Sequence, residues 1–266
     1  MLARVTSVII ERRKVEGGVV AVVTLDDAER RNVLSPPLVA AVADAFDQLE
    51  ADADVGAVVL TGAGRAFCAG ADLGDLSAGG QAAEGQRAAH LKGIYAGFVR
   101  VARSTLPTVA AVNGPAVGAG MNLALACDVR LVGRSGRFDT RFLRLNIHPG
   151  GGHMWMLRRA IGPQAASALV LFGQVAGAEE AVRLGLAHEV VADDALLDRA
   201  VELATPAAAA PRALVERMKQ ELTMPADEHD AALERELEAQ VWSMGQPAFT
   251  EQLAALQRTI SSAPKE

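Results

Sequence analysis

Two glycine-containing turns hold the residues of this 266-residue chain whose types and spacing best suit chemistry. One is Gly70-Ala71-Asp72, and the other is Gly118-Ala119-Gly120, which opens a predicted helix. The start of a helix leaves backbone N–H groups without partners and carries partial positive charge. Small residues let a ligand oxygen approach such groups, and two N–H groups aimed at one point form an oxyanion hole. The alternative is that both segments are ordinary tight turns.

The second turn also fits part of the dinucleotide-binding fingerprint, in which glycines follow a strand and open a helix. Leu123 stands where that fingerprint has its third glycine. No acidic residue ends a following strand at the required distance. The pattern therefore argues against a dehydrogenase.

The elements around these turns alternate between apolar strands and helices, which predicts an α/β core. The sequence predicts strands at 6–10, 18–25, 55–61, 108–112, 128–132 and 188–191. Ser35-Pro36-Pro37 is a helix start signal, and the stripe Leu38, Val42, Phe46 and Leu49 follows it. Further helices are predicted at 87–103, 119–127, 154–161, from 162 and at 178–184, with only helices after 193, and a loop at 77–85.

The composition argues against several classes of protein. The net charge of −6 disfavours nucleic acid or an anionic membrane as the main partner, since both need a basic face. The chain has no apolar run of about 18 residues that would predict a membrane span, and its start does not resemble a signal peptide. Its two cysteines, Cys68 and Cys127, exclude a disulfide framework and indicate a reducing, cytoplasmic setting.

Two motifs that contain the glycine turns make the chain resemble the crotonase (enoyl-CoA hydratase/isomerase) superfamily. Residues 66–73 (AFCAGADL) are similar to the family signature A-F-x-A-G-A-D-[LI]. Residues 111–128 are similar to A-x-N-G-x-A-x-G-[GA]-G-x-x-L-x-x-x-x-D. Segments 28–34, 149–152 and 178–187 also match, in the family's order, so the resemblance covers essentially the whole chain.

The resemblance implies an α/β fold: a spiral of ββα units over residues 1–204 and a C-terminal helical region, 205–266, that mediates trimerisation. It implies that the backbone N–H groups of Ala71 and Ala119 hold a thioester oxygen while the carbonyl becomes an enolate. It also implies an acyl-CoA substrate with no further cofactor, in a homotrimer or a dimer of trimers. The predicted substrate contacts are Arg31, Asn32, Ala69, Gly70, Asp72, Leu73, Gly118, Phe142 and Gly150.

Two departures from the family pattern argue against hydration by the usual mechanism. Hydratases of the family use two glutamates as acid and base on one water. The first stands two residues after the last glycine of the second motif, where this chain has Asn122. The other precedes the proline of the Pro-Gly segment by seven residues, where this chain has Phe142. Neither side chain exchanges a proton near neutral pH, whereas each general acid or base commonly contributes about 10²–10⁴-fold.

Other polar residues near these positions are candidates to replace the glutamates. His148 and His153 flank the glycine-rich segment 149–152, and histidine titrates at about pH 6.5. Asp139 lies just before Phe142. The alternative for each is a surface or capping role. We select His148 and Asn122 as the catalytic side-chain candidates, with Asn122 donating a hydrogen bond to substrate or water.

Four arginines, Arg12, Arg13, Arg30 and Arg31, are candidates for binding CoA phosphates, because a guanidinium group can donate two parallel hydrogen bonds to phosphate. We select Arg31, and expect the other three to lie on a solvated face. Cys68 is expected to fill space, because no base adjoins it.

These features support two classes of function. One is an enzyme that processes acyl-CoA thioesters through an enolate, by isomerisation, decarboxylation, thioester hydrolysis or residual hydration. The other is an acyl-CoA-binding protein that kept the pocket and lost proton transfer. Binding without turnover on a panel of thioesters would distinguish the second from the first.

Overall fold

The computed structural model describes residues 7–72 and 84–223. The chain divides into two compact units, Met1–Ala209 and Ala210–Glu266. The boundary predicted between residues 204 and 205 falls inside helix α7 (Leu196–Ala209), because Pro206 does not end that helix. Most of the predicted loop at 77–85 and the C-terminal residues from 224 lie outside the described residues.

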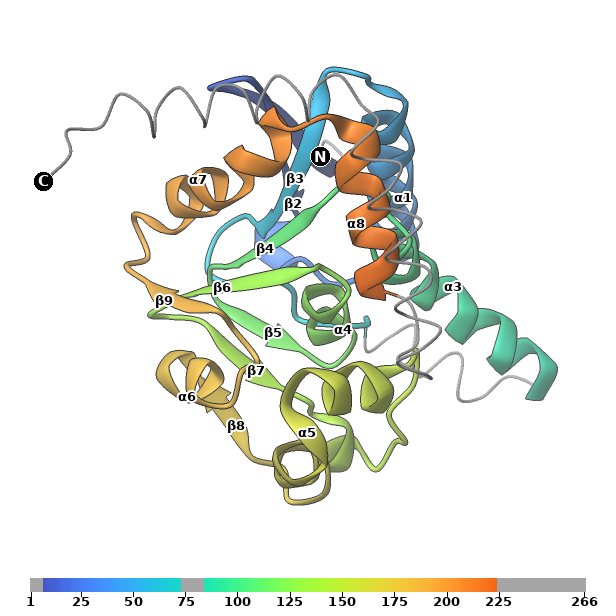
Figure 1. Cartoon of the computed structure of the whole chain (residues 1–266). Helices are drawn as coiled ribbons and strands as arrows, with labels where there is room; N and C mark the ends of the chain where they lie inside the picture. Colours follow the sequence, from blue (N-terminus) through green and yellow to red (C-terminus); the bar gives the residue numbers. More distant parts are fainter. Residues whose placement is uncertain (1–6, 73–83, 224–266) are drawn as a thin grey trace, which may run out of the picture. The chain divides into compact units, whose positions relative to one another are not determined.

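A six-stranded sheet forms the centre of the first unit, in the order β1-β2-β3-β4-β6-β9 (Figure 1). Its strands are β1 (Ser7–Val15), β2 (Gly18–Asp26), β3 (Val55–Gly62), β4 (Thr108–Val112), β6 (Val129–Gly133) and β9 (Glu189–Val191). The first two strands form an antiparallel hairpin, and the other neighbours pair in parallel. The inner strands β2, β3 and β4 are apolar and mostly buried, as is typical of a sheet that is covered on both faces.

Helices cover both faces of this sheet. Successive side chains of a strand point to opposite faces, so Val22 and Val59 pack against α7 on one face. Val23 and Leu60 face the other side, where α1 (Pro36–Ala51) and α3 (Glu84–Ala102) lie. Figure 1 shows α7 and α1 on opposite sides of the sheet. The four apolar residues of the predicted stripe in α1 are all buried, which confirms that prediction.

A second, three-stranded sheet with the order β5-β7-β8 lies beside the first (Figure 1). Its strands are β5 (Pro115–Val117), β7 (Arg137–Asp139) and β8 (Val175–Gly177). None of the three was predicted, because their three-residue segments lack the run of β-branched residues that marks 188–191. This sheet carries the turn that leads into α4 (Ala119–Leu125).

The remaining helices among the described residues of the first unit are η1 (Ala28–Arg30), η2 (Phe142–Leu145), α5 (His153–Leu171) and α6 (Ala178–Arg183). The predicted break at Gly162 is present as a kink in α5, where Gly162 has φ +74°. Gly185 follows α6 at φ +79°, as expected for the residue after a helix end. The predicted element types at these positions are therefore confirmed, with boundaries that shift by a few residues.

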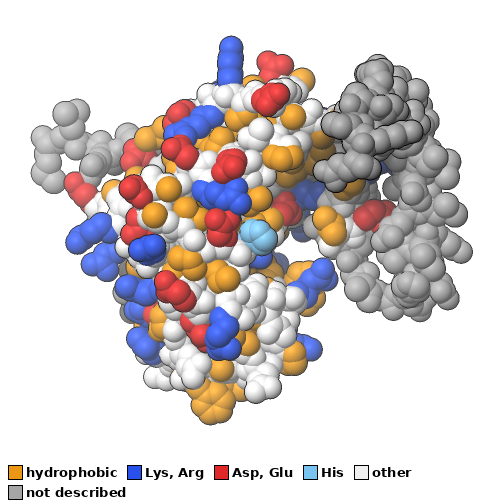
Figure 2. All heavy atoms as spheres, turned by 60° about the vertical axis from the view of Figure 1, so that its left-hand side comes forward, with side chains coloured by type: hydrophobic (Ala, Val, Ile, Leu, Met, Phe, Trp, Pro, Cys, Tyr) orange, Lys and Arg blue, Asp and Glu red, His pale blue; other side chains and the backbone are white. Residues whose placement is uncertain are grey.

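The surface carries charges of both signs. On the face drawn in Figure 2, basic and acidic side chains are interspersed, and apolar side chains are exposed among them. The most exposed large apolar side chains of the first unit include Trp155 in α5, and Leu171 and Phe172 at its end. Among the described helices, none combines the length and the apolar character that crossing a membrane requires.

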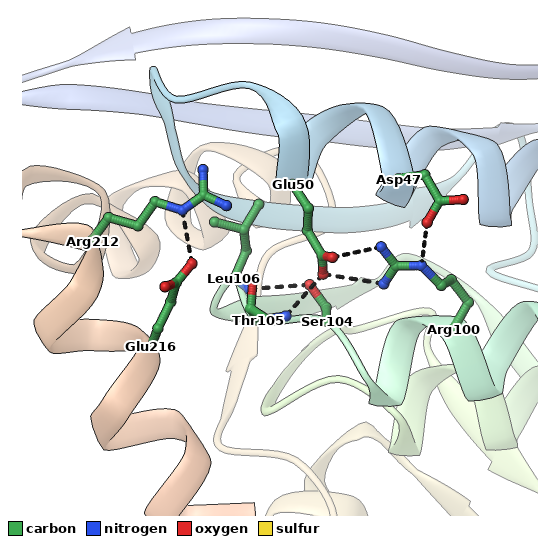
Figure 3. A network of polar contacts seen from close by, with 8 residues as sticks. All are labelled: Asp47, Glu50, Arg100, Ser104, Thr105, Leu106, Arg212 and Glu216. Carbon is green, nitrogen blue, oxygen red and sulfur yellow. Dashed lines mark hydrogen bonds and ion pairs between the residues drawn. The ribbon is translucent and has the colours of Figure 1, made fainter.

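A polar network fixes α3 to α1 (Figure 3). The Arg100 guanidinium donates to Asp47 Oδ1 at 2.6 Å and to Glu50 Oε2 at 2.7 Å. The backbone N–H of Thr105 donates to Glu50 Oε1 at 2.8 Å. Burial raises the pKa of Glu50, but the bonds from Arg100 and Thr105 outweigh it and lower that pKa below its ordinary value. The ionised carboxylate therefore holds the C-terminal end of α3 in place.

The second unit is described over α8 (Arg212–Thr223). Within this helix, Arg212 Nε donates to Glu216 Oε1 at 2.8 Å, a pair spaced by one helical turn (Figure 3). The predicted apolar stripe Leu214, Met218 and Leu222 lies in α8, where Met218 and Leu222 are exposed. The oligomerisation role predicted for the C-terminal region stays a prediction.

Candidate active site

Most of the predicted site residues line one cavity of about 890 Å³ in the first unit. Its wall is formed by parts of the segments 29–33, 69–72, 117–122 and 140–150 together with one side of α3. The predicted residues on this wall are Arg31, Ala69, Gly70, Ala71, Asp72, Gly118, Ala119, Asn122, Phe142, His148 and Gly150. Asn32 is absent from the wall, and Leu73 lies outside the described residues.

The two glycine turns meet at this cavity. The backbone N–H of Val117 donates to Cys68 O at 3.0 Å, which ties the two segments together. A Cβ on Gly70 would lie 2.5 Å from Val117 O and 3.5 Å from Ala119 N. Gly70 also has φ +91°, a conformation that side chains rarely adopt. Glycine is therefore required at 70 for this approach, and it brings the turn of Ala71 beside the start of α4.

Two backbone N–H groups at this junction have no acceptor. Ala119 is the first residue of α4, where helix geometry provides no intrahelical partner. Beside Ala71, the bridge to Leu34 uses Gly70 O, which accepts from Leu34 N–H at 2.8 Å. Among the described residues, no carbonyl or side chain accepts from the N–H of Ala71 or of Ala119. Two donors on one cavity wall are thus available to a ligand oxygen.

Arg31 lies next to this junction. The backbone N–H of Ala69 donates to Arg31 O at 2.9 Å, which holds the two segments side by side. The guanidinium of Arg31 is exposed, and no described residue forms an ion pair with it. The other three candidate arginines are paired: Arg12 with Asp52, Arg13 with Asp198 and Glu11, and Arg30 with Asp72. Arg31 is therefore the cation among these four that remains open to an anionic ligand.

Asn32 has a different place from the one predicted. Its side chain is fully buried, and its Nδ2 donates to Ala66 O at 2.9 Å and to Ala63 O at 3.0 Å. Its Oδ1 accepts from the backbone N–H of Asp27 at 2.9 Å. The side chain contacts the backbone behind the cavity, because its amide is the right length to satisfy these buried groups. It fixes the loop that carries Arg31 and has no contact with the cavity.

Asn122 belongs to the cavity wall, and both the nitrogen and the oxygen of its buried amide form a hydrogen bond. Its Nδ2 donates to Gly150 O at 3.0 Å. Its Oδ1 lies 2.6 Å from Nδ1 of His153, and since an amide oxygen only accepts, the imidazole donates. Both side chains are 1% exposed. The amide therefore has a fixed direction, and it links α4 to the segment at 150.

His153 is a neutral histidine at the first turn of α5. Burial lowers its pKa to about 4, so the ring is uncharged near neutral pH. Its Nε2 is buried and has no partner among the described residues. The ring of Phe142 packs edge-on against it, with the two ring centroids 4.9 Å apart. A Cβ on Gly118 would lie 3.9 Å from Phe142 Cζ, so the same phenyl ring also borders the turn at Gly118.

His148 and Asp139, the other proton-transfer candidates, differ in access. His148 is exposed and lines the cavity. Its Nδ1 lies 2.7 Å from Pro149 O, which can only accept, so Nδ1 donates and Nε2 is left for other partners. Asp139 is buried and accepts two bonds from Arg141, one of them from Nε at 2.9 Å. Asp139 does not line the cavity, whereas His148 does.

Tyr95 of α3 lines the cavity and was missed by the sequence analysis. It is the single tyrosine of the chain. Burial raises its pKa, and a hydrogen bond from the backbone N–H of Gly151 opposes that rise. The spacing of Leu91, Tyr95 and Phe98 on one side of α3 is the signal that would have found it, because helix neighbours lie three and four residues apart.

Two further observations limit the chemistry of the site. Burial raises the pKa of the Cys68 thiol to about 12, so it is a packing residue and not a nucleophile, as predicted. Within the residues that the structure describes, no group of three or more His, Cys, Asp or Glu side chains is placed to hold a metal ion.

Comparison with known proteins gives consistent matches. The model of the enoyl-CoA hydratase/isomerase family matches residues 15–253. A relative from Mycobacterium tuberculosis named "Probable enoyl-CoA hydratase EchA14" is 49% identical over 246 residues, covering 90% of this chain and 94% of the relative. The 1,2-epoxyphenylacetyl-CoA isomerase of Escherichia coli K12 is 37% identical over 198 residues, covering 74% of this chain and 75% of the isomerase. The crystal structure of an enoyl-CoA hydratase from Bacillus anthracis superposes with a TM-score of 0.86 at 29% identity, covering 94% of this chain and 96% of that one.

Proposed function

The chain belongs to the enoyl-CoA hydratase/isomerase family, and we propose that it converts acyl-CoA thioesters through an enolate whose oxygen is held by Ala71 and Ala119. Acyl-CoA processing of this type follows from the family match. One observation supports the finer proposal: the N–H groups of Ala71 and Ala119 have no acceptor among the described residues and belong to the wall of one cavity.

The two N–H groups act on the thioester oxygen. When a proton leaves the carbon next to the thioester carbonyl, negative charge moves to that oxygen. Donors already in position stabilise this charge without reorganisation, and each oxyanion-hole donor is typically worth about 10²–10³-fold in rate. Backbone donors suit Ala71 and Ala119, because alanine side chains leave the oxygen room to approach.

His148 is the proton carrier in this proposal. Its Nδ1 donates to Pro149 O, which leaves Nε2 to accept a proton from the substrate and to return it. Asn122 and Phe142 stand where hydratases of the family carry their glutamates, and neither can exchange a proton near neutral pH. Isomerisation requires one base that moves a proton between two carbons, so a single histidine suits it better than hydration.

A non-catalytic acyl-CoA-binding protein is the second candidate. The specific observation that favours it is that Asn122 and Phe142 both line the cavity and neither carries an ionisable group. In such a protein the cavity and the Arg31 cation would bind the ligand, and no proton would move.

Deuterium exchange tests the first candidate against the second. The protein is incubated in D₂O with saturated, enoyl- and malonyl-CoA thioesters, and masses are followed by mass spectrometry. Enolate formation adds deuterium next to the carbonyl of a saturated acyl-CoA even when no net reaction occurs. Binding by calorimetry without exchange or product on any thioester would overturn the enzyme proposal and leave the binding protein.

We also propose that the chain forms a homotrimer or a dimer of trimers. The exposed apolar side chains Trp155 and Phe172 support this, because large exposed apolar groups commonly mark protein interfaces. Sedimentation equilibrium should give three or six times the chain mass of 27.7 kDa. A monomer at micromolar concentration would contradict the proposal.

A further inference from the structure

The Asn122 amide has one donor left for the cavity. An amide nitrogen carries two hydrogens, and one of those on Asn122 Nδ2 is bonded to Gly150 O at 3.0 Å. The oxygen of the amide accepts from the buried His153 ring at 2.6 Å, so the amide cannot turn over without losing that bond. Asn122 lines the cavity. One amide hydrogen of Asn122 is therefore left at the cavity wall without a bond to a described residue.

The Tyr95 hydroxyl is a second donor at the same segment. A Cβ on Gly150 would lie 2.2 Å from Tyr95 Oη, so this oxygen is packed directly against the Gly150 backbone. The Gly151 N–H donates to it, which leaves the phenol proton for another acceptor. Burial raises the pKa of Tyr95, so the phenol keeps its proton near neutral pH. Tyr95 too presents a donor.

These two donors flank one residue. Asn122 bonds the carbonyl of Gly150, and Tyr95 rests against its Cα side. Both side chains line the cavity that contains Ala71 and Ala119. The helix that carries Tyr95 is tied to α1 by the Arg100–Glu50 ion pair.

We infer that Tyr95 and Asn122 form a hydrogen-bond donor subsite for a second oxygen on the acyl group, a ketone carbonyl or a carboxylate. The inference rests on the proposed function, because it needs the thioester to occupy the same cavity. A carbonyl or carboxylate oxygen only accepts, which matches two donors. An alkyl chain would leave both donors unpaired.

Calorimetric binding of three four-carbon ligands tests the inference: butyryl-CoA, acetoacetyl-CoA and succinyl-CoA. The wild-type protein should bind acetoacetyl-CoA or succinyl-CoA about tenfold more tightly than butyryl-CoA, since each hydrogen bond contributes a few-fold to about tenfold. The ligand that shows the preference identifies the acceptor as a ketone or a carboxylate.

Two variants test whether Tyr95 and Asn122 cause the preference for acetoacetyl-CoA or succinyl-CoA over butyryl-CoA. Tyr95→Phe and Asn122→Leu should each reduce this preference by about three- to tenfold. The preference is a ratio of two affinities, so a general loss of acyl-CoA binding cancels from it. Tyr95→Phe removes only the hydroxyl and leaves the Asn122–His153 bond intact, so it remains informative if Asn122→Leu fails to fold. Circular dichroism checks both variants.

The outcomes separate the two proposals. Equal affinity for all three ligands, or a preference that Tyr95→Phe does not change, would overturn the donor subsite while butyryl-CoA binding still supports the acyl-CoA site. If none of the three ligands binds, the acyl-CoA site itself is overturned.

Discussion

The imidazole of His153 donates through Nδ1 to Oδ1 of Asn122 at 2.6 Å, and this bond joins the first turn of α5 to α4. It sets the direction of the Asn122 amide, which the sequence resemblance predicts to stand in place of a hydratase glutamate. Because the ring is buried and neutral, the bond depends on a proton that the ring holds on Nδ1. The pair is thus a hydrogen-bonded brace and not an acid–base couple.

The buried ring predicts a pH dependence of stability. Its pKa is about 4 in the folded protein, against an ordinary value of 6.5. Between these values the unfolded chain binds a proton that the folded protein does not, so the free energy of unfolding falls as the pH falls. The contribution of His153 should decline by about 2 kcal/mol from pH 7.5 to about pH 5. Urea unfolding of the wild type and of His153→Phe at both values measures it.

His188→Phe is the matched control for that experiment. His188 is exposed, so its replacement should leave the pH dependence of the wild type in place. Parallel pH profiles for the wild type and His153→Phe would show that burial does not shift this ring.

Replacing the N–H of Ala119 tests the oxyanion hole. Ala119→Pro removes that donor, and proline is well tolerated at the first position of a helix. Deuterium exchange into a bound acyl-CoA should fall by about 10²–10³-fold, while the affinity for the saturated thioester changes little. An unchanged exchange rate in folded protein would remove Ala119 from the site.

Introducing glutamates at residues 122 and 142 tests the predicted departure from the hydratase pattern. The double variant Asn122→Glu, Phe142→Glu should raise crotonyl-CoA hydration by about 10²–10⁴-fold over the wild type. A glutamate at 122 can still accept from His153, whereas one at 142 loses the ring contact, so the folded fraction is checked by circular dichroism. No gain in folded protein would show that the acyl pocket itself excludes the reaction.

The free guanidinium of Arg31 should bind CoA phosphates. Arg31→Gln should weaken acyl-CoA binding by about five- to tenfold, as expected for a charged hydrogen bond near the surface. Arg12→Gln is the control, because Arg12 is paired with Asp52 and should change the affinity less than twofold. An acyl-pantetheine ligand, which lacks the phosphates, should bind Arg31→Gln and the wild type equally; a loss with both ligands would contradict a phosphate contact.

The close approach of the two turns depends on Gly70. Gly70→Ala would place a Cβ 2.5 Å from Val117 O at φ +91°, and should lower the free energy of unfolding by about 2 kcal/mol or more. Gly93→Ala is the control, because a Cβ there meets nothing within 4 Å. In the helix α3 it should stabilise the protein by about 0.5–1 kcal/mol. Equal stabilities of the two variants would contradict the strain at Gly70.

Local patterns predicted much of the fold, because they act within a few residues. The stripe from Leu38 to Leu49 identified α1, and the buried run at 18–25 identified β2. Pairing with one another defines the three short strands at 115–117, 137–139 and 175–177. Their local sequence patterns therefore did not predict them.

The candidate site likewise has features that the local sequence predicts and features that depend on the tertiary structure. The sequence by itself determined the small residues at the two turns, the absence of ionisable groups at 122 and 142, and the cation at 31. Only the tertiary structure decided the contacts of three side chains. Asn32 donates to a buried backbone carbonyl, His153 forms a hydrogen bond with Asn122, and the Tyr95 hydroxyl packs against Gly150. The physical reason is that the type of a residue is local, whereas its hydrogen-bond partner and its burial depend on segments that folding brings together.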